Sequence, residues 1–405
     1  MRTRCIGILP IILALLSPPG PTVAVRCSSV HGKASSSSII CTLLGKKASF
    51  GQIPGAAYKK SPACNHLAVH WSSVQARNLE DTLSVLFWNV ENFFDWRNDS
   101  TTVSDLEFSP AGERHWTWKR FQAKANAFAK ALFWVEGETG RLPDIIGLEE
   151  VENALVLRQV LQKTALRKTD YKYVHYDSPD RRGIDVALLY RSSVLELLDS
   201  KPCHLYAADT VMATRDILLC VFRRRAPDST AFAVLVNHHP SKYGGAAESE
   251  PRRRIAVERL RFLADSLAAI GIDRIIAGGD FNDTPDNPVF RLLEPALVPT
   301  HLDLCRRGRG TIKYDGKWDL IDHVYVSPGW IIMPPAGHEP TTGHQESTAP
   351  SSLSTPRMRI LRIPFLLTRD NVHSGEKPLR TYTGPRYTGG VSDHLPVMVE
   401  VSLPP

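Results

Sequence analysis

Two short segments carry polar side chains whose types suit phosphate and metal chemistry. In IIAGGDFND an apolar run leads directly into Asp280 and Asn282, and because side chains alternate along a strand, we expect both to point to the same side. In GGVSDHLPV, Asp393 and His394 precede another apolar run and face apart as neighbours. The first pair can handle a metal-bound phosphate and a water. In the second, Asp393 can bind a metal while His394 acts on a water. Each segment alone is also compatible with an ordinary turn.

Two further polar residues lie in or at the end of apolar runs. Asp322 lies within LIDHVYV, where a buried carboxylate is costly unless it is partnered, and an imidazole is its natural partner. His238 ends the run AFAVLVNH. If these runs are strands of one sheet, their polar ends meet at one edge, and both residues join the candidate site.

Two segments nearer the N-terminus offer oxygen ligands for a cation. FWNVEN places Asn89 and Glu91 two residues apart on one strand face, and DIIGLEE ends in Glu149 and Glu150. Hard cations such as Mg²⁺ take carboxylate oxygens and keep several waters, so dispersed acids suit Mg²⁺ better than a His/Cys cage. The seven cysteines include no CxxC spacing, which argues against a zinc-thiolate site. Each acid alone could instead be a solvated strand end.

Three arginines and two tryptophans are each compatible with more than one role. Arg181 and Arg182 in SPDRRG, and Arg215 in TRDILL, could clamp a phosphate, because guanidinium matches phosphate bidentately. Exposed arginines are also commonly just solvated. Trp116 and Trp118 could stack on bases, but we expect them to pack in the core beside a helix.

The elements that must position these residues are short apolar runs separated by turns and helical patterns. The segments HWTWKRFQAKANAFAKALFWV and RRRIAVERLRFLADSLAAI carry apolar residues at helical spacing and predict helices. Helices that flank mostly antiparallel strands predict an α+β fold, a four-layer α/β/β/α sandwich of two mostly antiparallel β-sheets. The expected buried strands are LSVLFW, DIIGLE, DVALLYR, AFAVLVNH, RIIAGGDF, LIDHVYV and LPVMVEV.

The first 80 residues differ from the rest in charge and pattern. They hold nine Lys/Arg and one acidic residue, which leaves 40 basic and 41 acidic residues in the remainder. The formal charge of +7 therefore does not indicate a polyanionic substrate. Arg2 and Arg4, the apolar run 6–16 and SPPGPTVAV have the order of a secretory signal peptide. We expect residues 1–25 to be this leader, with export to the periplasm, the cell surface or the medium.

The rest of the chain divides into a segment and a domain. Residues 26–80 are expected to be weakly ordered, with a small element packed on the domain as the alternative. Residues 81–403 form the expected domain, with a flexible insertion at 333–356 that is dense in Pro, Ser, Thr and Gly. After signal cleavage we expect no integral membrane span, because the run 6–16 is too short. The protein is expected to be a monomer.

In this order, WNVEN, GLEEVEN, NHHPS, GDFND, LID and SDHLPV resemble the endonuclease/exonuclease/phosphatase superfamily, which includes deoxyribonuclease I-like enzymes. The resemblance runs from about residue 83 to 401. SPDRRGIDVALLYR and GTIKYDGKWDLIDHVYVS are similar to a bacterial exported branch. The resemblance implies the sandwich fold and a phosphoesterase that depends on Mg²⁺ or Mn²⁺, with Ca²⁺ as an alternative.

The resemblance also implies a role for each candidate. Glu149 stands where the family has Gln, Glu91 where relatives often have Asp, and His238 where some have Tyr. The implied metal residues are Glu150 and Asp393, supported by Asn89 and Glu91. The implied catalytic residues are His394 with Asp322 behind it, Asp280 toward the attacking water, and Asn282 and His238 on the phosphoryl oxygens.

The function that we expect is therefore hydrolysis of phosphodiester bonds, nuclease-like, by in-line attack of water. A nuclease needs a basic groove, and the near-neutral net charge of the domain does not indicate one. The alternative is a phosphomonoesterase or phospholipase-type hydrolase acting on inositol phosphates or phospholipid head groups. A more distant alternative is a non-catalytic surface binding protein.

Overall fold

The computed structural model describes residues 82–99, 102–226, 229–242, 245–331 and 355–402. The predicted signal peptide, the segment 26–80 and nearly all of the predicted insertion 333–356 lie outside these residues. Within them, Cys203, Cys220 and Cys305 are free thiols. No helix in this part of the chain is long and apolar enough to cross a membrane.

Two six-stranded sheets form the centre of the domain. In each sheet four of the five neighbouring pairs are antiparallel and one central pair is parallel. The first sheet has the order β15(Arg359–Ile360), β20(Val397–Ser402), β1(Thr82–Phe93), β2(Ile145–Val151), β4(Asp185–Arg191) and β3(Tyr171–His175). The second has the order β11(Val298–Pro299), β14(Asp322–Val326), β10(Ile275–Asp280), β9(Ala231–His238), β8(Ile217–Arg224) and β5(Leu195–Cys203).

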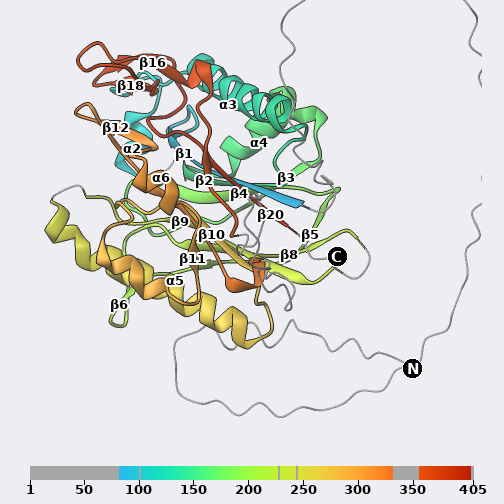
Figure 1. The fold of residues 1–405 in the computed structure, drawn as a ribbon. Helices are drawn as coiled ribbons and strands as arrows, with labels where there is room; N and C mark the ends of the chain where they lie inside the picture. Colours follow the sequence, from blue (N-terminus) through green and yellow to red (C-terminus); the bar gives the residue numbers. More distant parts are fainter. Residues whose placement is uncertain (1–81, 100–101, 227–228, 243–244, 332–354, 403–405) are drawn as a thin grey trace, which may run out of the picture. The chain divides into compact units, whose positions relative to one another are not determined.

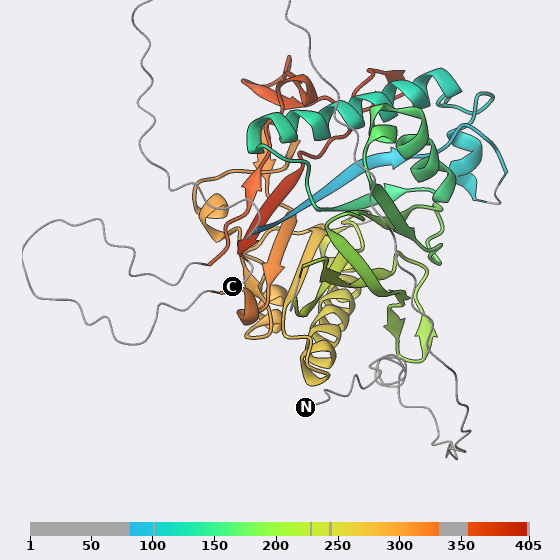
Figure 2. The same cartoon turned by 90° about the vertical axis from the view of Figure 1, so that its right-hand side faces the viewer.

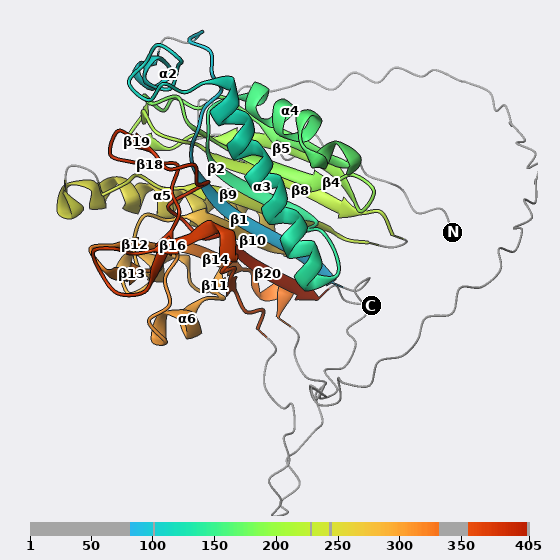
Figure 3. The same ribbon diagram turned by 90° about the horizontal axis from the view of Figure 1, so that it is seen from above.

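Helices cover the outer face of each sheet. The helices α3(Trp118–Thr139) and α4(Ala154–Lys163) lie on the first sheet, and α5(Ala246–Ala269) lies on the second (Figures 1 and 2). Figure 3 shows α3 lying over β1 and the neighbouring strands of the first sheet. One core cluster lies under α3, one under α5, and a third fills the space between the sheets. The predicted four-layer α/β/β/α sandwich is confirmed.

The helix α3 begins and ends where its sequence provides caps. The side chain of Thr117 accepts a hydrogen bond from the Arg120 amide at the N-terminus, and Gly140 takes a left-handed conformation, with φ 80°, at the C-terminus. Trp116 is fully buried, as expected. Trp118 is 40% exposed and packs against Trp96 at the surface, so the core position predicted for it is wrong.

Smaller elements connect these layers. They are α2(Val103–Glu107), η2(Ala165–Lys168), η3(Pro288–Leu293), α6(Leu302–Arg306), η4(Pro328–Trp330), η5(Pro364–Leu366) and the paired strands β6(Tyr206–Ala207) with β7(Thr210–Val211), β12(Ile312–Tyr314) with β13(Lys317–Asp319), β16(Leu367–Arg369) with β17(Glu376–Pro378), and β18(Tyr382–Thr383) with β19(Arg386–Tyr387).

The two parallel pairs decide where the polar strand ends lie. β1 is parallel to β2, with Asn89 opposite Glu149, and β9 is parallel to β10, with His238 opposite Asp280. Parallel strands end at the same edge of a sheet, so these four residues lie at carboxyl ends. β14 runs antiparallel to β10 and begins with Asp322 directly opposite Asp280. The fold thus gathers polar residues from distant segments at one end of the sandwich.

The spacing between the sheets depends on Phe87, whose ring lies between two glycines. A side-chain carbon added at Gly147 or at Gly278 would overlap this ring. We expect Gly278→Ala to lower the free energy of unfolding by about 1–3 kcal/mol, because a packed interior cannot absorb the extra carbon. Urea unfolding of the two proteins measures this difference.

Gly137 provides the matched control. It lies inside α3, and a carbon added there would meet nothing within 4 Å. Gly137→Ala should raise the free energy of unfolding by about 0.5–1 kcal/mol, because glycine is a poor residue in a helix. Equal effects of the two alanines would contradict the packing assigned to Phe87.

Candidate active site

Backbone strain concentrates at the polar edge of the sandwich. Four residues there have a positive φ without being glycine: Glu91 (48°), Asn92 (48°), Glu150 (65°) and Asn282 (52°). The β1–β2 register also shifts between Asn89 and Phe93. Left-handed backbone is unfavourable for residues with a side chain and persists where the surrounding structure enforces it, often at functional sites. This strain is a structural feature that the sequence patterns did not predict.

His394 and Asp322 form a buried pair at this edge. The Nδ1 of His394 lies 2.9 Å from Oδ2 and 3.1 Å from Oδ1 of Asp322. The opposite nitrogen, Nε2, lies 3.9 Å from Oδ2 of Asp280. Burial lowers the pKa of His394 because it disfavours the charged imidazole. The negative charges of Asp322 and then Asp280 have the larger combined effect, and the pKa of His394 lies well above its usual value. The predicted pair is therefore present, with its second nitrogen directed toward Asp280.

The carboxylate of Asp280 is fixed by hydrogen bonds from two residues, Asn89 and Asn282. Its Oδ2 accepts a hydrogen bond from Nδ2 of Asn89 at 3.0 Å, and its Oδ1 accepts one from the Asn282 amide at 2.8 Å. Burial raises the pKa of the Asp280 carboxyl above its usual value. A buried, hydrogen-bonded carboxylate beside an imidazole is well placed to orient a water.

Asn282 lies beside Asp280, but for a different reason than strand alternation. β10 ends at Asp280, and the left-handed backbone at Asn282 turns the Asn282 side chain back toward Asp280. Nδ2 of Asn282 lies 3.3 Å from Oδ2 of Asp280 and donates a hydrogen bond to the carbonyl of His239 at 3.0 Å. Both amide donors therefore have partners within the protein. The predicted contact of Asn282 with a phosphoryl oxygen stays a prediction.

The neighbouring acids Glu149 and Glu150 differ in environment. Glu149 is completely buried, neither of its carboxyl oxygens has a hydrogen-bond partner among the described residues, and Oε1 would lie 2.7 Å from a carbon added at Gly279. Burial, and then Asp322 and Asp280, raise the pKa of Glu149 well above its usual value. Glu150 is partly exposed, and its Oε2 accepts a hydrogen bond from the Asn92 amide at 2.8 Å. Glu150 is the acid of the two that reaches solvent.

Glu91 points away from Asn89, because its positive φ breaks the strand alternation. Its Oε1 lies 2.9 Å from Nη2 of Arg380, and its Oε2 accepts a hydrogen bond from the Thr381 amide at 2.8 Å. The same Nη2 lies 3.0 Å from Oδ2 of Asp393, whose side chain is 25% exposed. The two predicted metal residues Glu91 and Asp393 are therefore bridged by an arginine that the sequence patterns did not single out.

His238 lies between two of the acids. Its Nε2 is 3.6 Å from Oδ2 of Asp280 and 3.9 Å from Oε1 of Glu150. These approaches resemble ion pairs, but burial, and then Arg215, hold the pKa of His238 well below its usual value. The ring is therefore neutral at pH 7 and acts as a hydrogen-bonding group rather than as a cation.

The three predicted phosphate-binding arginines occupy different positions. Arg182 is half exposed, with Nη2 4.0 Å from Oε1 of Glu150. Arg215 is buried, and it donates to Asp180 at 3.0 Å and to the carbonyl of His239 at 2.7 Å, so it braces the loop around Asp180. Arg181 is exposed and has no ion pair among the described residues. Arg182 is the best placed of the three to meet a substrate.

The donor set at this edge fits a weakly held hard cation. The side chains of Glu150 and Asp393 are 13% and 25% exposed, and among the described residues the two buried oxygens of Glu149 have no hydrogen-bond partner. Mg²⁺ usually takes one or two carboxylates and keeps several waters. In the part of the chain that the structure describes, the only group of three His, Cys or acidic ligand atoms within 4.8 Å of one another is His175, Asp177 and Asp185, so a closed protein cage does not form around the predicted ligands.

Comparison with known proteins identifies the family of the chain. Residues 84–403 match the Endonuclease/Exonuclease/phosphatase family. The chain therefore belongs to this family of phosphoester hydrolases, as the resemblance of its motifs implies. No curated protein sequence matches the chain.

Solved structures with a similar arrangement share little sequence with the chain. The human Nocturnin catalytic domain with bound sulfate anion is 16% identical, covers 80% of this chain and 96% of its own, and has a TM-score of 0.48. An endonuclease/exonuclease/phosphatase family protein from Bacteroides thetaiotaomicron is 15% identical, with 80% and 98% covered and a TM-score of 0.47. A mannosyl-6-phosphatase from the same species is 15% identical, with 79% and 100% covered and a TM-score of 0.46.

Proposed function

We propose that this protein is an exported phosphoesterase that hydrolyses phosphodiester bonds, nuclease-like, with a divalent cation, Mg²⁺ or Mn²⁺. The observation that carries the proposal is the buried His394–Asp322 pair, with Asp280 beside it and Glu150 and Asp393 at the solvent side. These are the groups that in-line attack of water on phosphorus requires: one that orients the water, one that stabilises the developing charge, and carboxylates for a cation.

Each residue then has a defined task. Asp280, fixed by Asn89, orients the attacking water and accepts its proton. His394, whose protonated form Asp322 favours, stabilises the negative charge that builds on the phosphoryl oxygens. His238 and Asn282 bind those oxygens, and Arg182 contacts the substrate at the mouth of the site. Glu150 and Asp393 would hold the cation, which when bound neutralises charge on the phosphate and the leaving group.

A second candidate is hydrolysis of phosphomonoesters or phospholipid head groups. The charge balance favours this candidate, because residues 81–405 hold 40 basic and 41 acidic residues and do not supply the excess of positive charge that a long polyanion would need. A small phosphate ester needs only the local cations of the site. We further propose export, on the order of the residues in 1–25, and a monomeric state.

A substrate panel tests the proposal. Purified full-length protein with Mg²⁺ or Mn²⁺ is incubated with plasmid DNA, RNA, bis-p-nitrophenyl phosphate, inositol phosphates and choline phospholipids, and each reaction is repeated with a chelator. We expect metal-dependent hydrolysis of the diesters. Hydrolysis of monoesters or phospholipids alone would favour the second candidate. No hydrolysis of any substrate would reject the enzyme and leave a binding protein.

A further inference from the structure

We propose that Arg380 is a substrate-binding residue that contacts the phosphate oxygens at this site, an inference that rests on the proposed function. Arg380 lies between β17 and β18, 13 residues before Asp393 in the chain. Its Nε and Nη2 both contact Oε1 of Glu91, at 3.0 and 2.9 Å, and Nη2 also lies 3.0 Å from Oδ2 of Asp393. The guanidinium therefore stands directly beside one of the proposed metal carboxylates.

One side of the guanidinium remains available. The side chain is 48% exposed, and Nη1 has no hydrogen-bond partner in the described part of the chain. A cavity of about 240 Å³ adjoins it on the side of Glu91, with Arg114 and Tyr382 also in its lining. An anion bound at Asp393 would thus meet a half-exposed guanidinium next to this carboxylate. Guanidinium binds phosphate more strongly than a neutral donor does, because its hydrogen bonds are charge-assisted.

The orientation of Arg380 is fixed before any substrate arrives. Lys124 of α3 is completely buried, and its Nζ donates to the carbonyl of Glu91 and, at 2.9 Å, to Oγ1 of Thr381. Glu91 in turn accepts from the Thr381 amide. A buried lysine and a buried glutamate therefore hold both the backbone beside Arg380 and its guanidinium. A donor that is already ordered loses less entropy when it binds a ligand.

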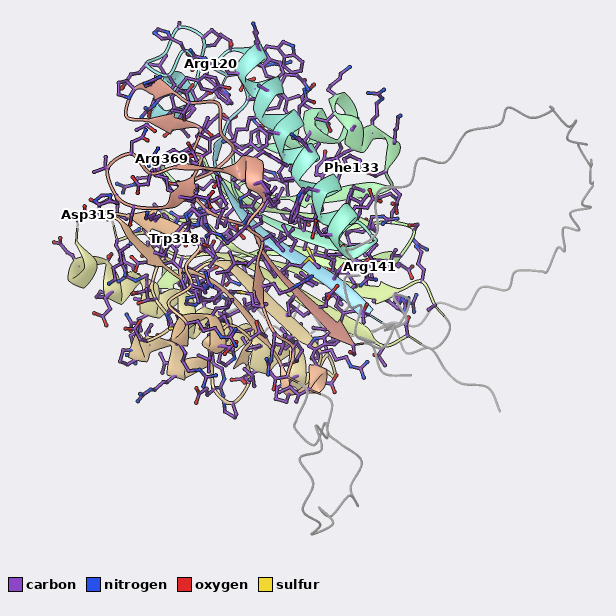
Figure 4. The ribbon with its side chains drawn as sticks, turned by 45° about the horizontal axis from the view of Figure 1, so that its top comes forward. Arg120, Phe133, Arg141, Asp315, Trp318 and Arg369 are labelled. Atoms are coloured by element: carbon purple, nitrogen blue, oxygen red, sulfur yellow. The ribbon has the colours of Figure 1, made fainter. Side chains whose placement is uncertain are left out.

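A second contact ties the same segment to α3. The guanidinium of Arg120, labelled at the start of α3 in Figure 4, lies 4.5 Å from the centre of the Tyr387 ring on β19. The residues that follow Arg380 are thus anchored to α3 at two points, Thr381 and Tyr387. Lys124 and Arg120 hold this segment without the guanidinium of Arg380, which is half exposed beside Asp393.

The test measures phosphate binding directly and does not depend on turnover. Isothermal titration calorimetry of the full-length protein with inorganic phosphate, in the presence of Mg²⁺, is carried out on the wild type, Arg380→Gln and Arg380→Lys. We expect Arg380→Gln to raise the Kd for phosphate about 10- to 100-fold, because a charge-assisted hydrogen bond is lost. Arg380→Lys keeps the positive charge but loses the paired N–H donors of the guanidinium, so its Kd for phosphate should lie between those of the wild type and Arg380→Gln. The same order is expected for KM with bis-p-nitrophenyl phosphate, with a smaller change in kcat.

Arg369→Gln is the matched control, because Arg369 is exposed on β16 of the same C-terminal segment and is labelled in Figure 4. Its Kd for phosphate should equal that of the wild type. Mg²⁺ affinity distinguishes a substrate-binding role of Arg380 from a purely structural one. Arg380→Gln removes the guanidinium charge that Glu91 and Asp393 share, so Mg²⁺ binding should be unchanged or tighter.

The outcomes are distinct. An unchanged Kd for phosphate in Arg380→Gln, weaker Mg²⁺ binding in that variant, or no phosphate binding by the wild type would each overturn the assignment of Arg380. If Arg380→Gln does not fold, Arg380→Lys decides by the same comparison. If the wild type binds phosphate through Arg380 but hydrolyses no ester, the proposed function fails while the phosphate contact stands.

Discussion

Asp280→Asn should lower kcat for phosphoester hydrolysis by on the order of 10²- to 10⁴-fold, the usual effect of losing a positioned acid or base. Asparagine has nearly the same shape but only one acceptor oxygen, so it can keep either the hydrogen bond from Asn89 or the one from the Asn282 amide. We expect the fold to persist with one of the two, which circular dichroism checks. What the variant loses is the charge that orients a water and accepts its proton. Initial rates with bis-p-nitrophenyl phosphate and Mg²⁺ measure the change.

Asp286→Asn is the control for this prediction. Asp286 lies six residues further along the chain and is exposed, so the same chemical change should leave kcat within about twofold of the wild type, as surface substitutions usually do. If the two variants retained equal activity, Asp280 would have no part in the chemistry.

The second large effect is expected at Glu150. Glu150→Gln should raise the Mg²⁺ concentration needed for half-maximal activity by at least about tenfold, because even the partners of a metal ligand alter metal affinity by roughly 10- to 100-fold. Chelation should remove all activity of the wild type, and added Mg²⁺ should restore it. Calorimetric titration of Mg²⁺ into each protein gives the affinity without reference to turnover.

The neighbouring residue offers a stringent comparison. Glu149→Gln makes the same chemical change one residue earlier, but Glu149 is completely buried, and burial, then Asp322 and Asp280, raise the pKa of its carboxyl well above the usual value. We therefore expect Glu149→Gln to leave the Mg²⁺ requirement unchanged. Weaker Mg²⁺ binding in Glu149→Gln than in Glu150→Gln would show that the metal carboxylate had been assigned to the wrong residue.

Much of the fold could be predicted because it depends on local pattern. Alternating and continuous apolar runs gave the strands that carry Asn89, His238 and Asp280, and helical spacing gave α3 and α5. The pairing of Asp322 with His394 came from the resemblance of the motifs, since nothing local connects residues 72 positions apart.

The positions that sequence reasoning missed depend on tertiary contacts and on backbone strain. Glu91 was expected on the same face as Asn89, but its left-handed backbone turns it toward Arg380, which lies 289 positions further along the chain. Asn282 reaches Asp280 through a turn rather than along a strand. Trp118 has the spacing of a core residue, yet it lies at the surface, where Trp96 covers only part of it.

The most direct test of the site as a whole is the rate of bis-p-nitrophenyl phosphate hydrolysis, with Mg²⁺ at pH 7, by the wild type and by His394→Ala. His394 contacts Asp322 and approaches Asp280, so it lies at the centre of the proposed machinery. We expect the variant to fold, as circular dichroism would show, and to lose activity by about 10²-fold or more. A folded His394→Ala protein that hydrolyses the diester at the wild-type rate would contradict the proposed site.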